Sequence, residues 1–237
     1  MQEVQVILEK ARECGEFAEV EVRFGRAEPH RPFEPGMSVE TLSALEEALD
    51  AFRDWSLVKE WSLTHAFQHG SAIPGDARML RTEAIFKSDT DVVVATRYKR
   101  PVASCTYSLD GAVDHQGYRV ALSSEEPVPS TDVPLAATPA RVCIKLRKEY
   151  LYTPSRWLRP VWAFHLTQRW AAGSFIEAVA KRVSRPPACD IELELVDLDY
   201  LHQNPPEEVV FHLQAKIRSV LRALHGSAST ASLVHRA

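Results

Sequence analysis

The sequence predicts an α+β protein, mainly β, in which one antiparallel barrel or sandwich is flanked by helices. Two observations carry this prediction. Short β-like runs separated by turn residues follow one another closely over residues 60–126 and again over 141–170, and such spacing favours a single barrel or sandwich. Amphipathic helical patterns lie near both ends of the chain. The expected order is helix, strand, helix, six or seven strands, helix.

Three segments show helical signals. Residues 1–16 form a short amphipathic pattern, and residues 205–226 begin with prolines and end with glycine, as helices often do. In residues 32–55 leucines recur at helical spacing after Ser38, the expected N-cap. Residues 174–183 are compatible with a helix or a strand.

The strand signals are short apolar runs bounded by turn residues. The runs are residues 17–26, 60–68, 77–86, 91–99, 102–109, 118–125, 141–152, 160–170 and 189–197. Four prolines mark residues 127–139 as a surface loop inserted between strands.

The composition is that of an ordinary globular protein, with 237 residues, 45% of them hydrophobic. A net charge of -4 gives no overall attraction to nucleic acid, so any contact with a polyanion must come from a local basic patch. The four cysteines have no paired metal-ligand spacing, and we expect them to stay reduced inside the cell. No signal peptide or membrane span is expected, so the protein should be soluble and without membrane contacts.

Two runs alternate acidic and apolar residues, which places the acids on one face of a strand. The charged face carries Glu19, Glu21 and Arg23 in the first run and Asp190, Glu192 and Glu194 in the second. A charged face in water is the simpler explanation for either run alone. Carboxylates about 5 Å apart repel each other, however, at roughly 3 kcal/mol per pair before screening. A divalent cation would reverse that repulsion, because Mg²⁺ and Mn²⁺ prefer oxygen ligands.

Other runs alternate lysine or arginine with apolar residues. These cations are Arg97, Lys99, Arg119, Arg141, Lys145 and Arg147. On an exposed sheet they would form cross-strand salt bridges that contribute little. If the sheet closes into a barrel, acids and cations instead line one lumen, which suits a metal ion bound together with a polyphosphate.

The run FAEVEVRFGR and the following PGMS resemble the opening of the metal-dependent mRNA 5'-triphosphatases of fungi, protozoa and large DNA viruses, which belong to the triphosphate tunnel metalloenzymes. Members of this family also have a basic strand near the middle and a closing strand of three alternating acids. All three motifs occur here in that order over residues 17–197. The resemblance implies a closed antiparallel tunnel of about eight strands, hydrolysis of the γ-phosphate of RNA, and Mg²⁺ or Mn²⁺ as cofactor. It implies one catalytic domain over residues 1–226, and residues 227–237 are expected to form a flexible tail.

The resemblance also implies roles for individual residues. Glu19 and Glu21 resemble the first pair of metal ligands, and Glu194 resembles the ligand from the closing strand. Lys145 and Arg147 match the phosphate clamp of the family.

Further catalytic residues are expected around the phosphate. Glu125 matches the acid that orients the attacking water, and it is our candidate general base. Arg119 shares a strand face with Glu125 and is expected to join the catalytic group. An arginine of the run 77–86 should also contact phosphate, with Arg78 preferred to Arg81.

Supporting roles are expected for Arg23, Lys99, His165, Thr167, Asp190 and Glu192. The family usually has Asp-x-Thr where this chain has His165 and Thr167. We expect His165 to orient Arg147 or a water, because an imidazole cannot supply the charge of a carboxylate. Asp190 stands where the family has glutamate, so its side chain is one methylene shorter.

The leading hypothesis is an RNA 5'-triphosphatase that acts on triphosphate-ended RNA in the first step of mRNA capping. A second hypothesis keeps the barrel and changes the substrate to tripolyphosphate, thiamine triphosphate or a nucleoside triphosphate. A third is a non-catalytic barrel that binds polyphosphate. Capping further implies association with a guanylyltransferase, a nuclear location in a nucleated cell, and the cytoplasm or virion for a virus.

Overall fold

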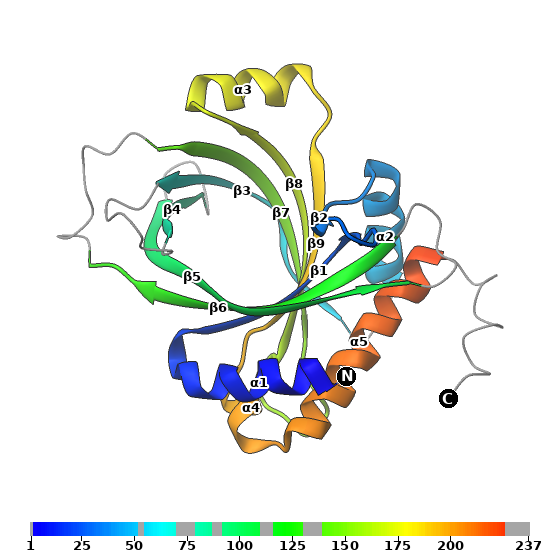
Figure 1. Ribbon diagram of the computed structural model, residues 1–237. Coiled ribbons are helices and arrows are strands. Elements are labelled where there is room, and N and C mark those ends of the chain that lie inside the picture. Colours follow the sequence, from blue (N-terminus) through cyan, green and yellow to red (C-terminus); the bar gives the residue numbers. More distant parts are fainter. Residues whose placement is uncertain are drawn as a thin grey trace.

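A closed β-barrel forms the body of the protein in a computed structural model that describes residues 2–51, 55–69, 79–86, 92–109, 116–129 and 139–225 (Figure 1). The strands are β1 (Ala18–Arg26), β2 (Glu34–Pro35), β3 (Ser56–His69), β4 (Met79–Phe86), β5 (Val92–Ser108), β6 (Gln116–Pro127), β7 (Arg141–Tyr152), β8 (Trp162–Ala172) and β9 (Ala188–Leu195). Eight of them follow the order β1-β6-β5-β4-β3-β7-β8-β9, and β9 pairs back onto β1. The closed antiparallel barrel of about eight strands is therefore confirmed, with β2 as an extra strand on β1.

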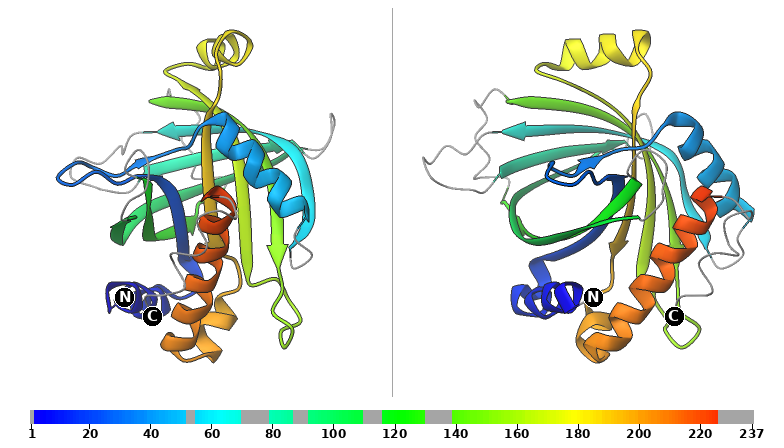
Figure 2. Two further views of the ribbon diagram at one scale, coloured as in Figure 1. Left: turned by 90° about the vertical axis from the view of Figure 1, so that its right-hand side faces the viewer. Right: turned by 45° about the vertical axis from the view of Figure 1, so that its right-hand side comes forward.

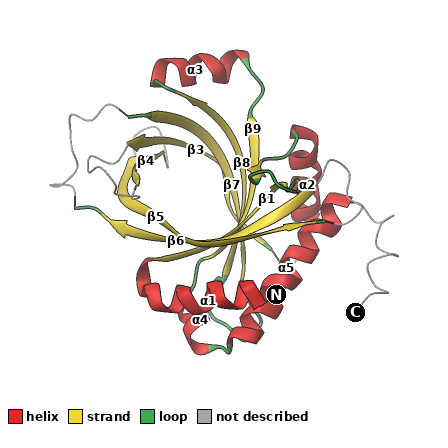
Figure 3. Ribbon diagram, in the orientation of Figure 1, coloured by secondary structure: helices red, strands yellow, loops and turns green. Residues whose placement is uncertain are grey.

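Helices cover the outside of the barrel (Figure 3). They are α1 (Gln2–Cys14), α2 (Val39–Ala51), α3 (Phe175–Ser184), α4 (Leu198–Gln203) and α5 (Pro206–His225), and a 3₁₀ turn, Gly15–Phe17, joins α1 to β1. Helices α1, α2, α4 and α5 gather on one side of the barrel (Figures 1 and 2). Helix α3 lies apart from them, between the end of β8 and the start of β9.

The predicted helices agree with these elements except at their ends. Ser38 caps α2 as expected, because its Oγ accepts a hydrogen bond of 3.1 Å from the Thr41 N–H. Helix α2 begins directly after this cap, as predicted for the stretch 32–55, and residues 34–35 before it pair with β1 as β2. For residues 174–183 the sequence allowed either a helix or a strand, and the structure forms helix α3 there. The expected tail, 227–237, lies outside the described residues.

The two predicted strands 91–99 and 102–109 are one strand, β5. Pro101 separates the two sequence patterns because proline has no N–H for a β-ladder. The structure accommodates it with a register shift between Pro101 and Ala103, and β6 pairs with β5 on both sides of the shift. The prediction of two separate strands over residues 91–109 was therefore wrong, because a β-bulge allows one strand to continue past a proline.

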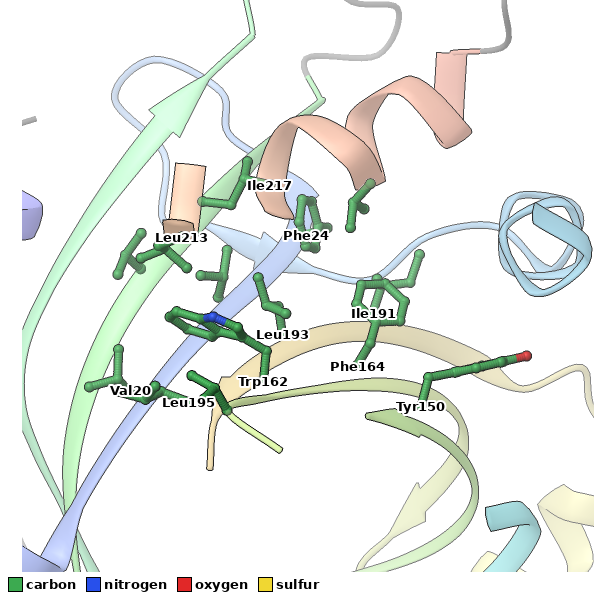
Figure 4. Packing of buried hydrophobic residues seen from close by; sticks show 14 of the residues in the cluster. Val20, Phe24, Tyr150, Trp162, Phe164, Ile191, Leu193, Leu195, Leu213 and Ile217 are labelled. Carbon is green, nitrogen blue, oxygen red and sulfur yellow. The ribbon is translucent and has the colours of Figure 1, made fainter. Parts of the chain in front are cut away.

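The hydrophobic core lies outside the barrel, between its strands and the helices. Val20 and Phe24 of β1, Phe164 of β8 and Leu193 of β9 point toward Leu213 and its neighbours on α5 (Figure 4). All five side chains are buried. Because side chains alternate along a strand, the charged faces of these strands point into the lumen.

A buried lysine ties α2 to the outer face of β7. The Lys148 Nζ donates hydrogen bonds to Glu46 at 3.0 Å and to Asp50 at 3.1 Å. The Tyr150 hydroxyl donates to the same Asp50 at 2.7 Å. Helix α2 is therefore held both by its leucines and by a charged cluster that neutralises Lys148.

Two chain-wide expectations can be compared with the structure. All four cysteines are free thiols. Within the described residues, no helix is both long and apolar enough to cross a membrane.

Gly25 is required for the close approach of β2 to β1. A Cβ added at Gly25 would lie 2.2 Å from the Glu34 carbonyl oxygen and 2.9 Å from the Pro35 Cα, both of them backbone atoms that cannot move aside easily. We expect Gly25→Ala to lower the free energy of unfolding by about 1–3 kcal/mol, measured by urea denaturation. Gly173→Ala is the matched control, because its added Cβ would meet only the Glu177 side chain at 3.7 Å. Equal stability of the two variants would contradict this account.

Candidate active site

The lumen of the barrel contains a cavity of about 350 Å³, which we call the tunnel chamber. Its charged lining consists of Glu19, Glu21, Glu83, Glu125, Asp190, Glu192 and Glu194, and of Arg23, Arg81, Arg97, Arg141, Lys145, Arg147 and Arg169. These fourteen residues come from seven different strands. Among the described residues, the lining thus balances seven acids against seven cations.

Pairing of β1 with β9 brings the two acidic strands together. Glu21 lies directly opposite Glu194, and Arg23 lies opposite Glu192. Glu19 precedes Glu21 on the same face of β1 and also lines the chamber. The three predicted metal ligands therefore form one acidic corner.

Two carboxyls in this corner hold their protons unusually strongly. Burial raises the pKa of Glu194 to about 8, and the charge of Glu19 adds to the rise. Burial also raises the pKa of Glu19 to about 7, against the opposing effect of the Lys99 ammonium. A cation bound between these carboxylates would stabilise their ionised forms and so oppose both shifts.

The donor chemistry of the acidic corner fits a hard divalent cation. Carboxylate oxygens are the ligands that Mg²⁺ and Mn²⁺ prefer. As placed, however, the described part of the chain contains no group of three His, Cys, Asp or Glu side chains arranged to hold a metal ion. The carboxylates contact internal cations instead: Lys99 donates to Glu19, and Arg23 donates to Glu21 at 3.0 Å. Metal binding would require these carboxylates to exchange partners.

A basic wall on β7, formed by Lys145 and Arg147, carries the predicted phosphate clamp. Lys145 Nζ donates a hydrogen bond of 3.0 Å to Glu83. Arg147 donates from Nε to the Thr167 hydroxyl at 3.3 Å and from Nη2 to Glu192 at 3.3 Å. Burial lowers the pKa of Lys145, and the nearby Arg147 adds to this effect. An anionic ligand would therefore be stabilised beside these two cations.

Glu192 connects the acidic corner to the basic wall. Its Oε1 lies 3.1 Å from Arg23 and its Oε2 lies 3.3 Å from Arg147. Burial alone would raise the pKa of Glu192, but Arg23 and Arg147 outweigh it and hold the pKa far below its ordinary value. Glu192 is therefore an anion that positions two arginines.

Glu125 lies at the edge of the same chamber with two cations. Arg97 donates to it at 2.8 Å, and its other oxygen lies 3.1 Å from Lys99. Burial acts to raise the pKa of Glu125, but Lys99 and Arg97 outweigh it and lower the pKa. Glu125 therefore stays ionised, and it can accept a hydrogen bond from water more readily than it can take a proton away.

Arg147 donates its hydrogen bonds to Thr167 and Glu192, and the close contacts of His165 are with two other acids. The imidazole Nε2 lies 3.3 Å from Glu149 and Nδ1 lies 3.5 Å from Glu194. Burial and the Arg147 charge lower the pKa of His165, so the ring is neutral. His165 thus lies between Glu149 and Glu194, and its buried Nδ1 has no hydrogen-bond partner among the described residues.

Most of the predicted site residues line the tunnel chamber, and the described ones that are not among its lining are Lys99, Arg119 and His165. Lys99 and Arg119 line a second cavity next to the tunnel chamber. His165 lines neither cavity. Arg78 lies outside the described residues, whereas the less favoured Arg81 lines both cavities.

Sequence reasoning missed two charged residues of the chamber lining. Glu83 holds Lys145 and Arg81, and Arg169 pairs with Asp190. Alternation along the strands could have identified both residues, because Glu83 shares a strand face with Arg81, and Arg169 shares one with Thr167.

The raised pKa values predict how stability depends on pH in the absence of a divalent cation. Glu19 and Glu194 lose their protons near pH 4.5 in the unfolded chain but only near pH 7 and pH 8 in the folded protein. The folded state therefore binds more protons over this window, and stability should fall as the pH rises from 5 to 8. Glu194→Gln should reduce this fall by on the order of 1 kcal/mol, measured by chemical denaturation at each pH.

Glu47→Gln provides the control, because Glu47 is exposed on α2 and far from the chamber in the fold. Its pH dependence should match that of the unaltered protein. Mg²⁺ should raise the melting temperature more at pH 8 than at pH 5. A Glu194→Gln variant with the unaltered pH slope would show that Glu194 ionises like a surface carboxyl.

Similarity to known proteins is found at the level of structure. No protein-family model and no curated protein sequence matches the chain. The fold is similar to the S. pombe Pct1 RNA triphosphatase, with a TM-score of 0.65 and 17% identity over 92% of this chain and 91% of that one. Pct1 in complex with the Spt5 CTD gives a TM-score of 0.66, also at 17% identity, with 92% of each chain covered. The Mimivirus capping enzyme triphosphatase gives a TM-score of 0.58 at 11% identity over 95% of this chain and 96% of that one.

At these identities the likeness is one of fold, and it extends over nearly the whole chain. The protein therefore has the closed-barrel fold of the RNA triphosphatases of S. pombe and Mimivirus.

Proposed function

We propose that this protein is a metal-dependent RNA 5'-triphosphatase that removes the γ-phosphate from triphosphate-ended RNA, the first step of mRNA capping. One observation carries the proposal: an acidic corner and a lysine–arginine wall line the same cavity inside a single closed barrel. Phosphoryl transfer depends mainly on positioning and on neutralising charge, which is what such a lining provides. Similarity in fold to two RNA triphosphatases supports the choice of RNA as substrate.

Glu19, Glu21 and Glu194 would hold the cation in the acidic corner. Mg²⁺ or Mn²⁺ bound there would supply positive charge to the phosphate oxygens. Glu192 remains paired with Arg23 and Arg147, so the cation does not leave these arginines without a partner.

Lys145 and Arg147 would bind the phosphate that is transferred. Both side chains already point into the chamber and are held by Glu83 and Thr167. The charge that develops on the phosphate oxygens would therefore meet cations that need little reorganisation.

Glu125 would orient the attacking water. Its lowered pKa keeps it ionised, so it can accept a hydrogen bond from the water at neutral pH. The transition state of phosphoryl transfer requires little proton removal before bond breaking, which suits a weak base.

Two further proposals follow from a role in capping. The product, a diphosphate-ended RNA, would be passed to a guanylyltransferase, which we propose as a partner. The site of action would then be the nucleus in a nucleated cell, or the cytoplasm or virion for a virus.

The first test is γ-phosphate release from triphosphate-ended RNA with Mg²⁺, with Mn²⁺ and with a chelator. We expect release only with a divalent cation, and we expect Glu21→Ala and Glu194→Ala each to reduce it by at least about 100-fold. Glu47→Ala should release phosphate at the unaltered rate. Hydrolysis of tripolyphosphate without hydrolysis of RNA would assign the tunnel to a small substrate. Release that survives both substitutions would overturn the proposed site.

Glu125→Gln separates catalysis from binding. The amide keeps the shape of the side chain but accepts hydrogen bonds less strongly, so kcat should fall by about 100-fold. Because Glu125 orients water and not the RNA, KM should change little. An unaltered kcat would exclude Glu125 from the chemical step, and RNA binding without turnover by the native protein would identify a non-catalytic barrel.

A further inference from the structure

A second cavity of about 550 Å³ adjoins the tunnel chamber. The two cavities share four lining residues, Glu21, Arg23, Gln68 and Arg81, and they adjoin at a junction formed by these side chains. A ligand that fills the tunnel chamber can therefore extend into the second cavity. Its volume lies within the roughly 300–1,000 Å³ that is typical of small-molecule sites.

Three arginines at the junction and in the second cavity have unused donors. The Nε atoms of Arg23, Arg81 and Arg119 are buried, and within the described part of the chain none has a hydrogen-bond partner. A buried donor without a partner costs about 1–3 kcal/mol. All three arginines line the second cavity. Oxygen atoms of a ligand at the junction would satisfy these donors, and phosphate oxygens suit arginine especially well.

The lining of the second cavity differs from that of the tunnel chamber. Met79, Pro101 and Val102 contribute apolar surface. The guanidinium of Arg119 lies over the Phe33 ring, 5.2 Å from its centroid, which holds the guanidinium at the cavity wall. Arginine planes of this kind stack on nucleic acid bases. The cavity therefore offers apolar contacts and a stacking surface rather than a second phosphate clamp.

The shape of β5 creates this space. The register shift between Pro101 and Ala103 bends the strand where it forms the cavity wall. Small side chains, Ser104 and Ala121, lie opposite each other on β5 and β6 and line the cavity there. A nucleoside is the part of a triphosphate-ended molecule that needs such room.

We propose that the second cavity binds the first nucleoside of the substrate, with the α-phosphate at the junction on Arg23 and Arg81. This inference rests on the proposed triphosphatase function and extends it, because it assigns the substrate class to nucleoside triphosphate ends rather than to inorganic polyphosphate. The β- and γ-phosphates lie in the tunnel chamber, and Arg119 contacts the nucleoside.

Binding of two ligands that resist hydrolysis tests the assignment. Titration calorimetry with Mg²⁺ compares the β,γ-imido analogue of ATP with inorganic imidodiphosphate, which lacks the nucleoside and the α-phosphate. Ser104→Trp places a large ring in the second cavity from an exposed position on β5. We expect it to weaken binding of the ATP analogue by at least about 10-fold and to leave imidodiphosphate within about 3-fold.

Val94→Trp is the matched control, because Val94 is an exposed residue of the same strand that lines neither cavity. It should bind both ligands like the unaltered protein. If Ser104→Trp weakens both ligands equally, or neither, the nucleoside site is wrong while the triphosphatase proposal stands. If the unaltered protein binds neither ligand and releases no phosphate from RNA, both proposals fail.

Discussion

The pairing of β9 with β1 is the constraint on which the rest of the structure depends. It closes the sheet, and it sets Glu21 beside Glu194 and Arg23 beside Glu192. A slip of this register by one residue would turn one set of side chains away from the lumen and expose the apolar set to it. The acidic corner and the link from Glu192 to the basic wall therefore both depend on one pair of strands that are far apart in the sequence.

Closure is possible because the apolar faces of the strands point outward. Phe164 and Leu193 pack beneath α5, while Lys148 ties α2 to β7 through Glu46 and Asp50. The helices thus provide the hydrophobic core that a barrel with a charged lumen cannot provide for itself. The lumen can therefore be lined by charged residues, because enough apolar surface is already buried between the strands and the helices.

Much of the site could be predicted from alternation alone, because period-2 patterns place Glu19 with Glu21 and Lys145 with Arg147 on single faces. Partners across strands could not be predicted, since register is set by packing and by turns rather than by local sequence. His165 illustrates the limit. The sequence showed that His165 stands where the resemblance predicts an aspartate. Its contacts with Glu149 and Glu194, however, depend on two neighbouring strands.

The balance of charges inside the tunnel would account for the metal dependence that we propose. In the protein alone, Glu19 is neutralised by Lys99 and Glu21 by Arg23, so a phosphate chain would have to compete with these carboxylates for the cations. A divalent cation that binds the carboxylates releases the lysine and arginine, which can then bind phosphate. Under the proposed function, metal and triphosphate would therefore favour each other's binding, because each would take the partners that the other frees.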